Sequence, residues 1–289
     1  MTVSHAALSR EQLERGYDNR GAVPEHPKWF ARWAEQSRDA RGRLKHASDL
    51  RYGPNPKETL DLFVPSGAPR GTFVFIHGGY WRALDKADHS FVALPFVQDG
   101  YAVAVLNYDL CPSVSIATIV DECRRAIAWL LREGPGRGAD TGTLVVGGHS
   151  AGGHLAAMML ATPAQAFGVE GHPVRAAVTL SGVHDLRPLT QVSFNADLKL
   201  DEAQATSLSP ALQRPATDAP LLVAVGADET SEFLRQSQLM FDAWPGNRPS
   251  GSEQPMLIPD GHHFSVVTDY ADSASTLTQR TLALLPSGR

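Results

Sequence analysis

The sequence has few cysteines, no long apolar run and no cluster of basic residues. Only Cys111 and Cys123 are cysteines among its 289 residues, so a disulfide framework is excluded and we expect a reducing, cytoplasmic setting. No run approaches the roughly 18 apolar residues of a membrane span, and residues 1–20 are too polar for a signal peptide. The net charge of −5 argues against nucleic-acid or anionic-membrane partners. We therefore expect a soluble protein that binds neither.

What the sequence does contain is a regular alternation of apolar strands and helical segments. Hydrophobic residues make up 43% of the chain and charged residues 20%, as in ordinary globular proteins. Continuous apolar runs that alternate with helices predict a mostly parallel sheet flanked by helices. We expect an α/β catalytic domain over residues 48–289, with an irregular insertion near 182–219. The predicted strands after the first hairpin are 71–76, 101–106, 144–146, 176–180, 221–225 and 255–258.

Residues 1–47 have a different character, because they are charged, aromatic and helical in pattern. Trp29, Phe30 and Trp33 fall on one face of the predicted helix. We expect an N-terminal helical arm that packs on the catalytic domain through this face. A role of these aromatic residues in lining a pocket, with the arm as a lid over it, is the alternative.

The segment Gly148-His149-Ser150-Ala151-Gly152 is the strongest functional signal. It follows a short apolar run and precedes an Ala-, Leu- and Met-rich run, so it reads as a strand, a tight turn and a helix. Such a turn holds its central serine in a strained conformation at the helix N-terminus, where unpaired N–H groups favour negative charge. We predict that Ser150 is a nucleophile. The alternative is a Gly/Ser loop that only caps a helix.

A serine nucleophile requires a base and an acid that orients the base. In this architecture both follow the serine, acid first, on loops after later strands. One such loop contains Asp228 and Glu229, and the next contains His262 and His263. We favour Glu229 as the acid and His263 as the base, with Asp228 and His262 as rivals.

His77-Gly78-Gly79 directly follows a buried strand. Glycine lets the backbone approach a reacting carbonyl closely, so Gly78 or Gly79 and the N–H of Ala151 are predicted to form an oxyanion hole. Tyr80 and Trp81 come next, and we expect them at the pocket rim as substrate-binding residues, with packing as an equal alternative.

We expect neither a metal nor a cofactor. Asp260 with the two neighbouring histidines suggests metal ligands at first sight. However, a zinc site needs three or four converging ligands, and the sequence has no H-E-x-x-H helix and no cysteine pair.

Together these motifs resemble the α/β-hydrolase fold, and specifically its kynurenine formamidase (arylformamidase) branch. The resemblance spans about residues 50–285. It implies that Glu229 is the acid, at a position where the family usually has Asp. The matching segments are His77-Gly78-Gly79-Tyr80-Trp81, residues 148–155, residues 181–186, Leu208-Ser209-Pro210, Glu232-Phe233, Gln236-Ser237 and His263-Phe264.

The resemblance implies a serine hydrolase that cleaves a small aryl formamide such as N-formylkynurenine through an acyl-enzyme on Ser150. A carboxylesterase for small acyl or aryl esters would use the same residues. A ligand-binding relative that has lost catalysis is the alternative of a different class. The sequence leaves the oligomeric state open, a homodimer included.

Overall fold

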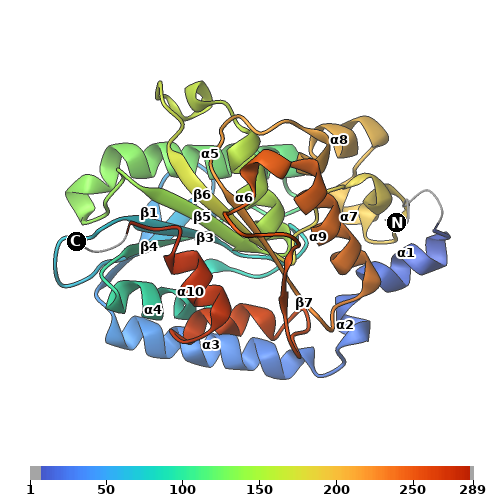
Figure 1. The fold of residues 1–289 in the computed structure, drawn as a ribbon, viewed down its shortest axis with the longest axis horizontal. Coiled ribbons are helices and arrows are strands. Elements are labelled where there is room, and N and C mark those ends of the chain that lie inside the picture. Colours follow the sequence, from blue (N-terminus) through green and yellow to red (C-terminus); the bar gives the residue numbers. More distant parts are fainter. Residues whose placement is uncertain (1–7, 287–289) are drawn as a thin grey trace.

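An eight-stranded sheet runs through the part of the chain that the structure, a computed structural model, describes: residues 8–286 (Figure 1). Its strand order is β1-β2-β4-β3-β5-β6-β7-β8. Strand β2 is antiparallel to both of its neighbours, and the remaining pairs are parallel. The prediction of a mostly parallel sheet is confirmed. The strands are β1 (His46–Arg51), β2 (Thr59–Phe63), β3 (Thr72–Ile76), β4 (Ala102–Leu106), β5 (Leu144–His149), β6 (Val174–Leu180), β7 (Leu221–Gly226) and β8 (Met256–Ile258).

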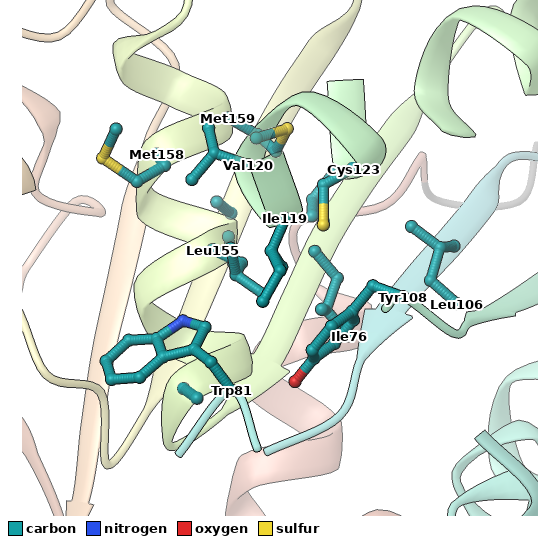
Figure 2. Packing of buried hydrophobic residues seen from close by; sticks show 14 of the residues in the cluster. Ile76, Trp81, Leu106, Tyr108, Ile119, Val120, Cys123, Leu155, Met158 and Met159 are labelled. Carbon is teal, nitrogen blue, oxygen red and sulfur yellow. The ribbon is translucent and has the colours of Figure 1, made fainter. Parts of the chain in front are cut away.

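Helices cover both faces of the sheet, as Figure 1 shows. Helices α5, α6 and α9 contribute to the hydrophobic core on one face, and α3, α4 and α10 contribute to the core on the other. Figure 2 shows part of the first core, in which Ile119 of α5 and Leu155 of α6 lie beside Ile76 of β3. The helices are α1 (Arg10–Tyr17), α2 (Asn19–Ala22), α3 (His26–Arg43), α4 (Ala93–Gln98), α5 (Ile116–Glu133), α6 (Ala151–Ala161), α7 (Asn195–Leu198), α8 (Glu202–Ser207), α9 (Ser231–Ala243) and α10 (Thr276–Leu282).

Strand β3 illustrates why the central strands are continuously apolar. Val74 and Ile76 belong to the core on one face, whereas Phe73 and Phe75 belong to the core on the other. Successive side chains of a strand point to opposite faces, so a strand between two helical layers needs apolar residues at every position.

Two predicted helices are shorter than expected. The segment 88–99 forms 3₁₀ turns and then only the short helix α4, in which Pro95 is the third residue. Proline is tolerated in the first turn of a helix but not further inside, so α4 begins just before it. The last predicted helix, 273–285, begins only at Thr276, because the Ser275 side chain caps it by accepting the N–H of Thr278.

The N-terminal arm consists of α1, α2 and α3. Helix α3 runs along the α4 side of the sheet (Figure 1) and buries Trp33 completely. Helix α1 packs on α9, on the opposite side of the sheet. The predicted boundary at residue 47 falls inside β1, which begins at His46. The first seven residues of the predicted arm lie outside the described residues.

The sheet brings the ends of its parallel strands to one edge. Ile76 at the end of β3 pairs with Gly148 near the end of β5, and Gly226 at the end of β7 pairs with Ile258 at the end of β8. The loops that follow these strands therefore meet at the carboxyl edge, where ligands bind in open α/β sheets. Within residues 8–286, no helix is long and apolar enough to cross a membrane.

Candidate active site

Ser150 lies between β5 and α6 in a strained backbone conformation. Its φ is 57° and its ψ is −120°, a region that non-glycine residues rarely adopt. The turn is tight enough that a Cβ on Gly148 would collide with the carbonyl of Gly152, and one on Gly152 with the carbonyl of Ile76. Glycine at both positions therefore permits the turn that presents the Ser150 hydroxyl at the start of α6.

His263 and Glu229 continue from this hydroxyl as a chain of hydrogen bonds. The Nε2 atom of His263 lies 3.1 Å from Oγ of Ser150, and its Nδ1 lies 2.7 Å from Oε2 of Glu229. A carboxylate only accepts hydrogen bonds, so Nδ1 carries the ring proton and Nε2 presents its lone pair to Ser150. This is the arrangement in which an imidazole accepts a proton from serine.

The two rivals from the sequence lie elsewhere. Asp228 is exposed, and its backbone N–H donates to the carbonyl of Gly261 at 2.9 Å. The Nδ1 atom of His262 accepts the N–H groups of Phe264 and Ser265, both at 3.2 Å. The structure therefore brings one member of each pair, Glu229 and His263, to Ser150.

The carboxylate of Glu229 is held by further donors that the sequence did not reveal. Its Oε1 accepts a hydrogen bond from the hydroxyl of Ser181 and another from the N–H of Gly226, the latter at 3.0 Å. Ser181 directly follows β6 and has a φ of 53°. A strained backbone at a non-glycine residue persists where the surroundings demand it, and here it places a hydroxyl on the buried acid. The only sequence signal was its position within the matching segment 181–186.

His149, the residue before Ser150, supports the backbone of His263. Nε2 of His149 lies 2.9 Å from the carbonyl oxygen of His263, so Nε2 carries the ring proton and its N–H donates a hydrogen bond to that oxygen. Burial, followed by the nearby His263, holds the pKa of His149 well below its ordinary value. His149 is therefore neutral and fixes the backbone that carries the His263 ring.

The predicted oxyanion donors lie beside Ser150. A Cβ on Gly78 would lie 3.0 Å from Cβ of Ser150, and Ala151 opens α6, where the first N–H groups have no acceptor within the helix. The Tyr108 hydroxyl lies 2.8 Å from the carbonyl oxygen of His77 and 3.2 Å from that of Gly78. Since C=O and N–H point in opposite directions across a trans peptide, the N–H groups of Gly78 and Gly79 point away from Tyr108.

The His77 side chain supports the loop that contains Gly78 and Gly79. Its ring stacks on Tyr108 with centroids 4.3 Å apart, and its Nε2 lies 3.1 Å from Oδ1 of Asn107. Burial, together with the neighbouring His89, lowers the pKa of His77 to about 3. A neutral, buried imidazole in this place acts as a structural support of the loop.

A cavity of about 620 Å³ opens above Ser150 and His263. Phe30 and Trp33 of the arm line it, so these aromatic residues border the cavity in addition to packing on the domain. The insertion near 182–219 contributes Ser193, Phe194 and Asp197. The sequence did not indicate that the insertion reaches the site.

Tyr80 and Trp81 occupy different places relative to the cavity. Tyr80 lines the cavity, but Trp81 is fully buried and does not. The Trp81 ring packs edge-on against His154 with centroids 5.1 Å apart, and Figure 2 shows it among the core side chains beside α6. The prediction of Trp81 as a substrate-binding residue is therefore wrong. The backbone has positive φ at both residues, 51° and 57°, and this turn sends the two rings in different directions.

Among residues 8–286, no three His, Cys, Asp or Glu side chains converge on one point.

The chemistry that the site supports is acyl transfer through serine, and the fold and the contacts of Ser150, His263 and Glu229 define the chain as a serine hydrolase of the α/β-hydrolase fold. Residues 60–244 match the family model BD-FAE, and the chain belongs to this family.

Relatives of known name cover most of the chain. Kynurenine formamidases from Salmo salar and Danio rerio are each 29% identical to it over 259 and 253 residues, which are 87% and 85% of the chain and 86% and 84% of those proteins. The crystal structure of a provisionally assigned thioesterase from Silicibacter sp. TM1040 has a TM-score of 0.82 at 34% identity, covering 92% of this chain and 97% of that one. An esterase from Pyrobaculum calidifontis, at 18% identity and a TM-score of 0.70 over 95% and 96% of the two chains, shares the fold.

Proposed function

We propose that this protein is an arylformamidase that hydrolyses N-formylkynurenine or a similar aryl formamide. The observation that carries the proposal is the chain of contacts from Glu229 through His263 to Ser150, in a cavity with aromatic walls. The curated relatives that match most of the chain are kynurenine formamidases. Their name supplies the substrate class, and the cavity is compatible with it.

In the first half of the reaction, the Ser150 hydroxyl attacks the formyl carbon while His263 Nε2 takes its proton. Glu229 holds the ring in the required tautomer and stabilises the imidazolium that forms. The N–H groups of Gly79 or Gly78 and of Ala151 hold the oxyanion, where one donor is worth roughly 3–4 kcal/mol. The C–N bond then breaks, the imidazolium protonates the leaving arylamine, and a formyl ester remains on Ser150.

In the second half, water enters the site and gives a proton to His263 as its oxygen attacks the formyl ester. The tetrahedral intermediate collapses, Ser150 recovers its proton from His263, and formate leaves. Water and formamide are thereby converted to arylamine and formic acid, which releases a proton to become formate, with no cofactor.

The walls of the cavity fit an aromatic leaving group. Phe30, Trp33 and Tyr80 line it beside the nucleophile, and aromatic side chains interact with a further ring in edge-to-face or offset-stacked arrangements. Formyl is the smallest acyl group, so most of the cavity remains for the leaving group.

A carboxylesterase is the second candidate, since it requires the same three side chains. Its support is the chain's likeness to the Silicibacter thioesterase and to esterase LipQ of Mycobacterium tuberculosis, which is 30% identical over 152 residues, 48% of this chain and 36% of that protein.

The deciding experiment compares kcat/KM on N-formyl-L-kynurenine and on p-nitrophenyl acetate. A formamidase prefers the former by well over the ~10²-fold that a loosely fitting pocket provides. A preference for the ester would favour the carboxylesterase, and turnover of neither would contradict both.

The same assay tests the nucleophile. We expect Ser150→Ala to lower kcat on either substrate by at least about 10⁴-fold. Ser48→Ala, at an exposed serine on β1, is the control and should behave as the wild type. Substantial turnover by Ser150→Ala would overturn the assignment.

A further inference from the structure

The junction of α1 and α2, residues 17–20, forms part of the cavity wall although it lies far from the loops of Ser150, Glu229 and His263 in sequence. Tyr17, Asp18, Asn19 and Arg20 all line the cavity. The junction is held in place from two sides. The Tyr80 hydroxyl donates to the carbonyl of Tyr17 at 2.7 Å, and the side-chain amide of Gln236 in α9 donates to the Tyr17 hydroxyl at 2.8 Å. It is therefore a fixed wall that presents Arg20 beside the site.

Arg20 differs from the other arginines of the cavity in having no acidic partner. Arg82 is paired with Asp197 at 2.6 Å, and Arg15 lies 3.9 Å from Glu11. No carboxylate oxygen within residues 8–286 lies within 4.0 Å of a guanidinium nitrogen of Arg20.

The acidic groups nearby are bound by backbone N–H groups instead. Oδ1 of Asp18 accepts the N–H of Gly21 at 2.9 Å, and Oε1 of Glu14 accepts the N–H of Ser193 at 2.6 Å. The guanidinium of Arg20 has its Cζ 5.8 Å from the centre of the Phe30 ring, a contact that leaves its N–H donors free.

An unpaired guanidinium in the wall of a substrate cavity is suited to a carboxylate, which it binds through two parallel hydrogen bonds. We propose that Arg20 is a specificity-determining residue that binds a carboxylate on the leaving group of the substrate. The inference rests on the proposed function and refines it, because it selects aryl formamides whose ring carries an acidic side chain. N-formylkynurenine, with its amino-acid group, is one such compound.

Competition against p-nitrophenyl acetate hydrolysis tests the inference without requiring cleavage of a formamide. L-kynurenine carries the ring, the ketone and the amino-acid group, whereas 2-aminoacetophenone carries only the ring and the ketone. In the wild type, we expect L-kynurenine to have the lower inhibition constant. In Arg20→Gln, we expect the ratio of the inhibition constants, L-kynurenine over 2-aminoacetophenone, to rise at least about tenfold.

Arg32→Gln is the matched control. Arg32 is also an exposed arginine of the arm, with Cζ 5.5 Å from the Trp29 ring, but it does not line the cavity. Its substitution should leave the ratio as in the wild type. Arg20→Lys, which keeps the charge but loses the bidentate geometry, should give an intermediate ratio.

The outcomes separate the two proposals. An unchanged ratio in Arg20→Gln, or an equal change in Arg32→Gln, would overturn the role of Arg20. Failure of the wild type to hydrolyse N-formyl-L-kynurenine would overturn the proposed substrate, while a raised ratio in the same preparation would still support carboxylate binding by Arg20.

Discussion

The loops at the carboxyl edge of the sheet and the N-terminal arm border the same cavity, but they are built differently. In the loops, each candidate catalytic residue lies within a few positions of a strand end, and the backbone is strained at Ser150 and at Ser181. In the arm, the cavity residues come from the junction of α1 and α2 and from helix α3, all of which precede the sheet in the chain.

The loops and the arm reach the cavity by different physical means. A parallel sheet aligns its strand ends, so the loops meet because of topology alone. The arm reaches the site only through packing. Thr230 donates to the carbonyl of Gly16 at 2.5 Å, and Gly16 lies directly against the Glu232 side chain. We therefore expect changes in the loops to affect the chemical step, and changes in the arm to affect substrate binding and stability.

Among the residues around Ser150 and in the arm, the largest effect on kcat should come from Glu229. An amide in Glu229→Gln can donate to Nδ1 of His263 and so favour the wrong tautomer, which costs about 10³- to 10⁴-fold in kcat in such triads. Asp228→Asn, at the exposed neighbour, should change kcat by less than about threefold. Steady-state kinetics on p-nitrophenyl acetate measure both. A larger loss in Asp228→Asn would reverse the assignment.

A smaller effect should come from Ser181, which supports the acid without touching the reacting atoms. Its loss removes a hydrogen bond to a charged group, worth about 1.5–3 kcal/mol, and we expect Ser181→Ala to lower kcat about tenfold with KM little changed.

Ser209→Ala is the control for Ser181. The Ser209 hydroxyl is also buried and accepts the N–H of Leu186 at 2.7 Å, but it does not contact the acid. It should lower the free energy of unfolding and leave kcat near the wild-type value. Identical kinetic behaviour of the two variants would show that Ser181 has only a structural role.

The smallest effect on catalysis should come from a change in the arm. In Gly16→Ala, the new Cβ collides with Cγ of Glu232, whose carboxylate is held by Arg235 at 3.0 and 2.9 Å. We expect a net loss of about 1–2 kcal/mol in the free energy of unfolding, as overpacking outweighs the gain in helix propensity. KM should rise a few-fold with kcat retained.

Gly42→Ala in α3 is the matched control, because nothing lies within 4 Å of its added Cβ. It should raise the free energy of unfolding by up to about 1 kcal/mol and leave KM unchanged. Urea unfolding and steady-state kinetics measure both variants. A loss of kcat in Gly16→Ala would contradict the division between loops and arm.

Much of the fold was predictable because strands buried on both faces need unbroken apolar runs, and those of β3 to β7 are plain in the sequence. The short α4 was harder to predict, since the effect of one proline depends on where the helix starts. The sequence favours Glu229 over its neighbour Asp228 but leaves both as candidates, because a loop of the same length can turn either carboxylate inward.

The sequence by itself determined the architecture, the strained turn at Ser150 and the order of serine, acid and histidine, since these follow from local pattern and from topology. Only the tertiary structure decided which carboxylate and which imidazole face Ser150, that Trp81 enters the core, and that residues 17–20 border the cavity. These depend on the direction of single side chains and on packing between segments far apart in the chain, which no local pattern encodes.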